Sequence, residues 1–583
     1  MGAVLGLFSL AIPVAFVALV VWALRRRGPA APGAEARGVR RFFQYLVLLA
    51  LVVVAAIGLS DLLARALGST PGYDDRADLA RSLAFVLVAV PLGALLGRWT
   101  ARTHRVDAEE RGSAMYALYV AGTALITLAV AMFALSDVLA IALGAARFDG
   151  GAVGRLVVFG AAWWFHWWLG RRTLNVEQAA PHLLLGSLIG LGTVLAGFVA
   201  AVAQALRLLA FDQAFLGGGD MLGRAAALFV TGALVWGWYW NRGAARLPRG
   251  VLWLVYVLPL GVGGGLLTAL VGASIALWQL LVWFAGDRFG ATAAEHFDST
   301  PTAAAVAVGG LLVWWYHRTV LGRQPERTEV QRVHEYLVSG IGLLAAASGV
   351  GMVVVAAIEA FTPGLDLGMS VVNTLLGAVT LLLVGVPVWW VFWGRIRRAT
   401  RAEPAPEVAS PTRRTYLVLL FGLAGVAAVI ALIVVVFMLL RDVLAGSVSG
   451  ETIRSMRYGL GVLLATAAVS GYHGAVYRQD RGVATPARTE GPRSVLLVGG
   501  PGRDVEREVE RRTGAHVQVW ARLDGAGVAW SVEDLVSRLL THPGEDVLVL
   551  AGADGVTVVA VDRSGRLPAP PPASAAAPTP VDG

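Results

Sequence analysis

The sequence predicts an all-α polytopic membrane protein of about 13 transmembrane helices, built from six tandem two-helix repeats, with a small soluble α/β domain at the C-terminus. Three observations lead to this fold class. Of the 583 residues, 57% are hydrophobic and only 15% are charged. Apolar runs of about 20 residues, the length that crosses a bilayer, recur almost to residue 480. Six of these runs end in aromatic residues and an arginine, at Arg98, Arg171, Arg242, Arg318, Arg395 and Arg478.

The first predicted span covers residues 3–24, within an N-terminal anchor over residues 1–24. Its apolar run is followed directly by Arg25, Arg26 and Arg27. A cleavable signal peptide carries its positive charge before the apolar run, so the reverse order predicts a retained span. Because arginines stay on the cytoplasmic side of a membrane, we expect the N-terminus outside.

Twelve further spans form six pairs over residues 39–480. In each pair, helix A leaves the cytoplasm and helix B returns to it. Each helix is long enough to cross about 30 Å of hydrocarbon at about 1.5 Å per residue. The predicted pairs are 39–67 with 78–99, 113–145 with 152–170, 181–210 with 221–241, 251–285 with 301–317, 334–361 with 369–394, and 414–445 with 453–477.

The arginines decide the orientation of the pairs. The six loops that precede A helices hold 25 arginines, whereas the six loops that join A to B hold three, Arg76, Arg147 and Arg288. Arginine-rich loops remain in the cytoplasm, which also places the C-terminus inside. The positions of these arginines explain the net charge of +9 by membrane topology. We therefore expect the lipid bilayer as a partner and no nucleic acid. All 48 basic residues are arginine, which indicates a bacterial coding bias and hence the plasma (inner) membrane.

Tryptophan is concentrated at the cytoplasmic ends of the B helices, which hold 13 of the 19 tryptophans. An indole has an apolar body and one N–H donor, so it favours the boundary between hydrocarbon and headgroups. The distribution is typical of an aromatic belt. An aromatic substrate box is the alternative interpretation.

Short motifs recur within the pairs. Helix A opens as Arg41-Phe42-Phe43-Gln44-Tyr45 and closes as Asp61-Leu62-Leu63, and helix B ends as Trp315-Tyr316-His317-Arg318. In such motifs the chain resembles a bacterial multi-pass membrane-domain family of unknown function built from repeated paired helices, over about residues 39–480. The resemblance implies a fold and a location but no substrate. The third repeat departs from the pattern, because Trp238-Tyr239-Trp240 lacks the histidine.

Several repeats place an acid near the outer end of helix A and an arginine near the outer start of helix B. A charge near the hydrocarbon boundary is costly unless it is paired. We interpret the pairs as clasps that fix each hairpin or, alternatively, as charges lining an outer vestibule or proton path. Glu359 lies near an outer end without an arginine partner in its own hairpin, which makes it a further vestibule candidate. The pairs are Asp61 with Arg81, Asp137 with Arg155, and Asp442 with Arg457.

His166, His317 and His473 recur at the inner ends of three B helices. Imidazoles that face one another could hold haem or a metal, or relay protons; the other interpretation is hydrogen-bonded residues of the aromatic belt. The chain has no cysteine, which excludes thiolate metal sites and disulfides. It also lacks the His-Glu-x-x-His and Gly-x-Ser-x-Gly motifs. We predict no metal, no cofactor and no enzyme activity.

One predicted A helix, 251–285, is interrupted by Pro259 and by Gly263, Gly264 and Gly265. Transporters often bind substrate at such broken helices, where freed backbone groups face a cavity. Proline kinks and closely packed glycines also occur in ordinary helix bundles. Because each repeat has two spans, the repeats are parallel in orientation and not inverted.

The composition changes after Arg478. Residues 484–492 are predicted as a linker, 493–563 as a cytoplasmic α/β domain and 564–583 as a disordered Pro/Ala-rich tail. A glycine-rich turn after the first strand could hold a phosphate but lacks the P-loop motif, so we expect a cytoplasmic protein partner for this domain. The predicted strands are 494–498, 516–521, 546–550 and 556–561, and the predicted helices are 503–513 and 532–540.

These features favour a non-enzymatic membrane scaffold or sensor with a cytoplasmic interaction domain. The alternative is a small-solute or ion transporter or channel that uses the interrupted helix 251–285 and the outer-vestibule acids. A third hypothesis, a haem-containing membrane protein, rests on the histidines alone. The sequence names no substrate for any of the three.

Overall fold

The computed structural model describes residues 34–68, 75–211, 218–322, 327–362, 369–482, 491–499, 503–520, 531–552 and 555–561. The predicted N-terminal span 3–24, most of the linker 484–492 and the tail 564–583 therefore lie outside the described residues. The chain divides into two compact units, which are taken one at a time below. Unit 1 is Met1–Arg397 with Leu419–Tyr472, and unit 2 is Arg398–Val418 with His473–Gly583.

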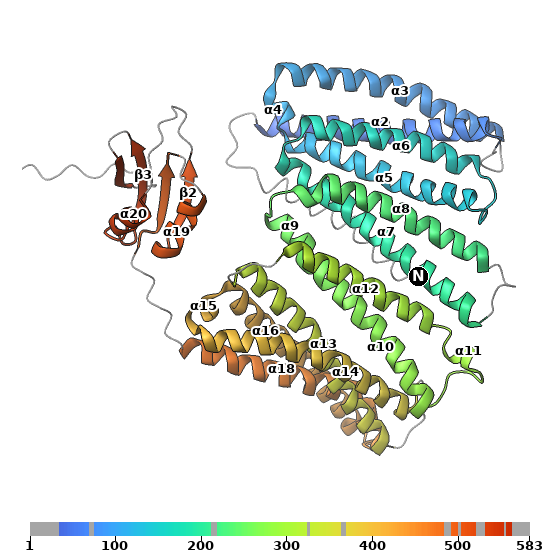
Figure 1. The fold of residues 1–583 in the computed structure, drawn as a ribbon. Coiled ribbons are helices and arrows are strands. Elements are labelled where there is room, and N and C mark those ends of the chain that lie inside the picture. The colour runs from blue at the N-terminus through green and yellow to red at the C-terminus, as the bar shows by residue number, and fades with distance from the viewer. Residues whose placement is uncertain are drawn as a thin grey trace, which may run out of the picture. The chain divides into compact units, whose positions relative to one another are not determined.

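Long helices follow one another as six hairpins, numbered here in chain order, and each consists of a helix A and a helix B (Figure 1). Hairpin 1 is α2 (Ala34–Ala66) with α3 (Asp75–Val106), hairpin 2 is α5 (Ala114–Ala142) with α6 (Gly150–Thr173), and hairpin 3 is α7 (Val176–Phe211) with α8 (Gly218–Arg242). Hairpin 4 is α9 (Val251–Val255), η3 (Tyr256–Gly263) and α10 (Gly264–Ala285) with α12 (Thr300–Leu321), hairpin 5 is α13 (Glu329–Phe361) with α14 (Val371–Ala402), and hairpin 6 is α16 (Pro411–Leu444) with α18 (Arg457–Gly482).

In the described part of the chain, five short helices lie in the loops between the long ones. They are α4 (Ala108–Arg111), η2 (Ala244–Arg246), α11 (Ala293–His296), α15 (Pro404–Ala409) and α17 (Gly450–Ser455). The paired helices therefore occupy the regions that the sequence predicts, and most extend a few residues beyond the predicted ends.

Within the described residues, ten helices are long and apolar enough to cross a membrane. Two helices that the sequence analysis counts as spans, α6 and α12, are not among the ten. Both are shorter than the others, with 24 and 22 residues, and their C-terminal thirds carry tryptophan, histidine and arginine. These residue types lower the mean hydropathy of a helix, although an indole is stable at the boundary between hydrocarbon and headgroups.

Glycine brings the two helices of a hairpin into backbone contact. In hairpin 3, a Cβ added to Gly232 of α8 would lie 2.2 Å from the backbone nitrogen of Val194 of α7. In hairpin 4, a Cβ on Gly310 of α12 would lie 2.3 Å from the nitrogen of Ala269 of α10. Small residues serve this purpose in membranes, where packing replaces the hydrophobic effect as the attraction between helices.

The helix around Pro259 is not interrupted, which corrects the prediction of a break. Residues Tyr256–Gly263 form a π-helical segment that joins α9 to α10 in one continuous helix. A proline lacks the N–H for a normal turn, and a wider π turn accommodates this loss without ending the helix. The neighbouring glycines are in contact with protein: Gly261 faces the ring of His317, and a Cβ on Gly265 would lie 2.5 Å from the nitrogen of Trp314.

Unit 2 contains a four-stranded sheet with the strand order β2-β1-β3-β4. β1 is parallel to β2 and β3, whereas β4 is antiparallel to β3. Val495, Leu497, Val509, Leu535 and Val549 are fully buried in its core. The elements are β1 (Ser494–Val498), α19 (Arg503–Thr513), β2 (His516–Trp520), α20 (Val532–Leu539), β3 (Asp546–Gly552) and β4 (Gly555–Val561), close to the predicted bounds.

Candidate functional site: the contacts between successive hairpins

The helix ends that meet at the turn within a hairpin are called outer ends here, and the ends beside the arginine-rich loops are called inner ends. The outer end of helix A in hairpin 5 is tied to the outer start of helix B in hairpin 6. The Nε of Arg457 lies 2.8 Å from Oε1 of Glu359, whose side chain is 8% exposed. Arg454 donates to the backbone oxygens of Glu359, at 3.2 Å, and Thr362, at 2.9 Å. These oxygens belong to the last turn and the C-cap of α13, where backbone carbonyls lack N–H donors from the helix itself, so Arg454 caps the helix. Glu359 therefore has an arginine partner, supplied by the next hairpin.

The structure corrects the three predicted pairings within hairpins. Arg457 contacts Glu359 and not Asp442, whose carboxylate instead accepts from Arg441 at 2.8 Å. Arg81 and Arg155 each pair with an acid that is close in sequence. Such an acid lies within one or two helical turns, so the pairing does not depend on how two helices align. Among the described residues, no ion pair joins Asp61 with Arg81 or Asp137 with Arg155; the pairs are Arg81 with Asp78 at 2.9 Å and Arg155 with Asp149 at 3.5 Å.

Two other hairpin junctions have the same arrangement at their outer ends. Between hairpins 3 and 4, Arg207 of α7 donates to Thr302 of α12 at 2.9 Å and to the backbone oxygen of Asp298 at 3.3 Å. Between hairpins 4 and 5, the side chain of Asn373 accepts from the Asp287 N–H at 2.9 Å and donates to the Asp287 oxygen at 2.8 Å. Buried and half-buried polar groups at the outer ends thus join helix A of one hairpin to helix B of the next.

The inner ends are joined by hydrogen bonds between tryptophan and tyrosine of successive B helices. Trp240 Nε1–H donates to the hydroxyl of Tyr316 at 2.6 Å, and Trp163 donates to Tyr239 at 2.8 Å. Trp393 donates in the same way to Tyr472 at 2.8 Å. The departure of the third repeat from the histidine pattern now has a structural reason, because Trp240 takes the place of the histidine and supplies the donor to hairpin 4.

The candidate histidines face helix A of their own hairpins. His166 interacts through Nδ1 with the backbone oxygen of Ala162 at 2.8 Å and through Nε2 with the hydroxyl of Tyr119 at 3.0 Å. The ring of His317 lies against Tyr256, with centroids 5.7 Å apart. In unit 2, the ring of His473 lies 5.8 Å from that of Tyr416. His166 and His317 therefore belong to separate aromatic clusters and do not form a facing pair.

Three acids at the inner ends of the helices form ion pairs that the sequence did not reveal, because the loop arginines served only as markers of orientation. Glu110, 2% exposed, pairs with Arg40 and with Arg41, the latter at 3.0 Å. Arg327 lies 2.7 Å from Glu335. An acid beside an arginine-rich loop was the signal in each case. The third pair, in unit 2, joins Arg413 with Asp480 at 2.7 Å.

In unit 2, the surface of α19 carries charged side chains that pair with one another. Glu508 accepts from Arg512 at 2.7 Å, and this hydrogen bond lowers the pKa of the Glu508 carboxyl. The glycine-rich turn that was considered for phosphate binding lies mostly outside the described residues, because residues 500–502 are not described.

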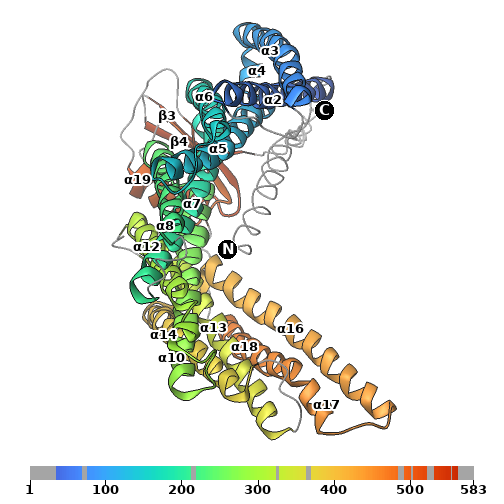
Figure 2. The same cartoon turned by 90° about the vertical axis from the view of Figure 1, so that its right-hand side faces the viewer.

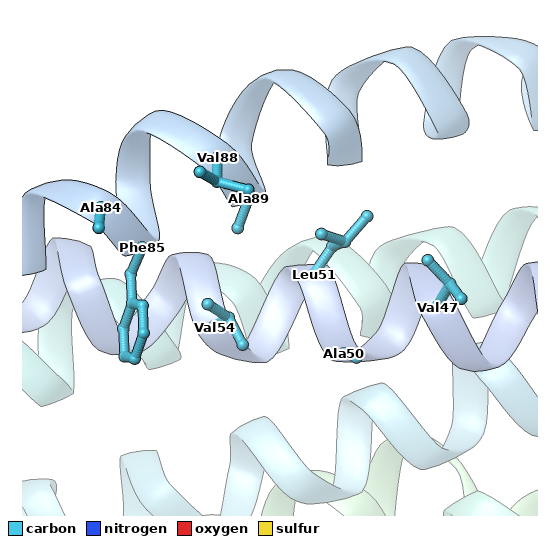
Figure 3. A pocket seen from close by; sticks show the side chains of 8 residues that line it. All are labelled: Val47, Ala50, Leu51, Val54, Ala84, Phe85, Val88 and Ala89. Carbon is cyan, nitrogen blue, oxygen red and sulfur yellow. The ribbon is translucent and has the colours of Figure 1, made fainter. Parts of the chain in front are cut away.

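An apolar cleft of about 350 Å³ lies between the two helices of hairpin 1 (Figure 3). None of its lining residues has a polar side chain, so the cleft offers no hydrogen bond or charge to a polar solute. The lining residues are Val47, Ala50, Leu51, Val54, Ala84, Phe85, Val88 and Ala89.

The two features proposed for a transporter, the π segment and Glu359, are far apart when measured along α13. Gly263 of the π segment packs against Leu337, close to the inner end of this helix. Glu359 is 22 residues further on, which corresponds to about 33 Å along a helix that rises about 1.5 Å per residue. The π segment and Glu359 therefore do not line one local site.

The chain matches the family model described as a domain of unknown function (DUF5671) twice, at residues 41–149 and 332–468. The first match covers α3 and α5 and nearly all of α2, and the second covers nearly all of hairpin 5 and much of hairpin 6. Together the matches cover less than half of the chain, and they leave out the middle hairpins, where the repeat pattern departs. No curated protein and no solved structure matches the chain. The two matches and the ten apolar helices fit a multi-span membrane protein of an uncharacterised kind.

Proposed function

We propose that this protein is a non-enzymatic scaffold or sensor of the bacterial plasma membrane, with the N-terminus outside and the C-terminus in the cytoplasm. The α/β domain over residues 493–563 then offers a surface to a cytoplasmic protein partner. The observation that carries the proposal is the use of the buried charged and polar groups. Glu359, Arg454, Arg207 and Asn373 all bind the adjacent hairpin, which is the role of structural clasps.

The alternative, a small-solute or ion transporter or channel, needs polar groups that face a shared cavity. The π segment packs against His317, Trp314 and Leu337, and Glu359 is held by Arg457 about 33 Å away along α13. These contacts favour the scaffold. A haem-binding role has less support, because His166 engages Tyr119 and Ala162 within its own hairpin.

The substitution Glu359→Gln separates the two functions. For a scaffold, loss of the charge leaves Arg457 without its partner at a largely buried site, so the protein loses about 2–4 kcal/mol of stability. Thermal unfolding of the purified full chain in detergent measures this loss. The double variant Glu359→Arg with Arg457→Glu should recover part of it, because the ion pair is restored with reversed polarity.

Proton flux into liposomes loaded with a pH-sensitive dye provides the second readout. Under an imposed membrane potential, a scaffold gives the same flux as empty liposomes, with or without Glu359→Gln. A flux that depends on the wild-type chain and disappears in Glu359→Gln, while thermal stability is unchanged, would favour the transporter instead.

A further inference from the structure

Helix α16 (orange in Figure 2) carries a stripe of large apolar residues with exposed side chains. Successive members of the stripe are three or four residues apart, which places them on one face of the helix. Each is more than half exposed. Residues beside the stripe, such as Val429, are exposed as well, whereas the buried residues Ala431 and Val435 lie on the face toward α18. The stripe consists of Leu423, Val426, Ile430, Ile433, Phe437 and Leu440.

In the preceding hairpins, helix A has two packing faces. Gly349 of α13 faces its own helix B, since a Cβ there would lie 2.9 Å from Leu382 of α14. Gly351, two residues further, faces helix B of the next hairpin, because the Cβ of an alanine at Gly461 of α18 would lie 2.6 Å from the Gly351 oxygen. Two residues correspond to about 200° around a helix, so the two faces are nearly opposite.

The same offset occurs in hairpin 1. Gly58 of α2 faces its own α3, as a Cβ there would lie 2.8 Å from the oxygen of Ser82. Ser60, two residues further, faces α6 of the next hairpin, where a Cβ on Gly154 would lie 2.5 Å from the Ser60 oxygen. One face of helix A thus holds its own B helix, and the opposite face receives the B helix that follows.

On α16, the stripe occupies the face that receives a following B helix. Val435 marks the other face, because it lies 2.8 Å from the position of a Cβ on Gly459 of its own partner α18. Phe437, two residues further, belongs to the stripe and is 64% exposed. Hairpin 6 therefore repeats the receiving face of α2 and α13, and no hairpin follows it in the chain described.

The B helices that occupy this face share three features. They run from the outer to the inner side, they end in aromatic residues and arginine, and they place a glycine near the preceding A helix, as Gly154 and Gly461 do. The predicted N-terminal span 3–24 is similar to these helices in sequence. It is expected to run inward, its sequence has Gly6 near the start, and Trp22 precedes Arg25 at the end.

We propose that the N-terminal span 3–24 of a second copy of this chain packs on the apolar stripe of α16. Residues 25–33 connect the span to α2 and reach about 30 Å when extended. Five hairpin-to-hairpin steps of about 8–10 Å separate hairpin 1 from hairpin 6. The connection of about 30 Å is therefore too short for the N-terminal span to reach α16 of the same chain. The contact joins different surfaces of the two copies, which makes the association head-to-tail. It does not depend on the scaffold proposal.

Disulfide cross-linking tests this contact directly, because the native chain has no cysteine. Two differently tagged full-length chains are co-expressed, one with Val14→Cys and the other with Ile430→Cys, and the membranes are oxidised. An antiparallel pairing predicts an adduct of twice the monomer mass that carries both tags. Gly6→Cys with Phe437→Cys and Val20→Cys with Leu423→Cys probe the two ends of the same register and should also form adducts.

The matched control is Val14→Cys with Leu87→Cys, because Leu87 of α3 is 70% exposed and equally apolar but lies on no receiving face. The proposal expects an adduct at least five times more abundant with Ile430 than with Leu87. Equal yields would mean random collision and would overturn it. Absence of both adducts overturns it too, provided that both variants reach the membrane at the parental level. An adduct at monomer mass, obtained when both cysteines are in one chain, would assign the stripe to the chain's own span.

Discussion

At the scale of single residues, the hydrogen bond from Trp240 to Tyr316 is a defined link between hairpins 3 and 4. Replacing Trp240 with Phe keeps an aromatic ring in a buried place and removes only the N–H donor and part of the ring volume. We expect a loss of about 1–3 kcal/mol from the unpaired hydroxyl and the smaller ring, measured by thermal unfolding in detergent.

Trp164→Phe is the matched control for that experiment, since Trp164 is 48% exposed in the same aromatic belt. Its stability should change by less than about 0.5 kcal/mol. In a double-mutant cycle, Trp240→Phe and Tyr316→Phe should be less destabilising together than the sum of the single changes. Additive effects would mean that the hydrogen bond contributes nothing.

The residues of the candidate site were only partly predictable from the sequence. Motif spacing identified Glu359 and Arg457 as unusual charges, and the structure shows that they bind each other. Their pairing was not predictable from motif spacing, because the partner of Glu359 lies 98 positions further along the chain, in the next hairpin. The histidine positions were found by repetition, but the choice of partner, such as Tyr119 for His166, depends on how helix A is rotated.

At the scale of elements, the close contact of α7 and α8 depends on the absence of side chains. Gly232→Ala would place a methyl group 2.2 Å from the backbone of Val194 and force the helices apart. We expect a destabilisation of about 1–3 kcal/mol. Gly160→Ala in α6 is the matched control, because a Cβ there meets nothing within 4 Å. The control should be neutral or gain up to about 1 kcal/mol from the better helix propensity of alanine.

In unit 2, Arg413 joins the start of α16 to the end of α18. It is 4% exposed and binds both oxygens of Asp480, at 2.7 and 2.9 Å. Arg413→Gln removes one side of a largely buried ion pair, for which we expect a loss of about 2–4 kcal/mol. Arg414→Gln changes the neighbouring exposed arginine and should leave the unfolding temperature unchanged. Equal effects of the two substitutions would show that net charge, and not the ion pair, determines stability.

Elements were predictable where one periodicity dominates. The short apolar run Ser494–Val498, which is followed by a glycine-rich turn, predicts a strand, and the structure has β1 at the same residues. The π segment was not predictable, because Pro259 and the glycines that follow suit either a break or a wide turn. Packing against α12 and α13 decides between them, and this packing is a tertiary property.

At the scale of the whole molecule, hydropathy and arginine counts predicted a bundle of paired apolar helices, and the described residues contain ten helices of membrane length. The predicted count of 13 spans exceeds these ten helices. The predicted span 3–24 lies outside the described residues, and α6 and α12 do not reach the length and hydropathy of the other helices. We nevertheless expect both helices to cross, because the loops on either side of each differ in arginine content.

The central claim is that each hairpin crosses the membrane twice with its arginine-rich loops inside, and α6 provides its strictest test. Arg147→Cys and Asn175→Cys flank this helix in a chain without other cysteines. A maleimide that cannot cross membranes is applied to intact spheroplasts, and labelling is compared with that after lysis. The account predicts labelling of Arg147→Cys in intact spheroplasts and of Asn175→Cys only after lysis. Labelling of both positions from the same side would contradict the paired-span architecture.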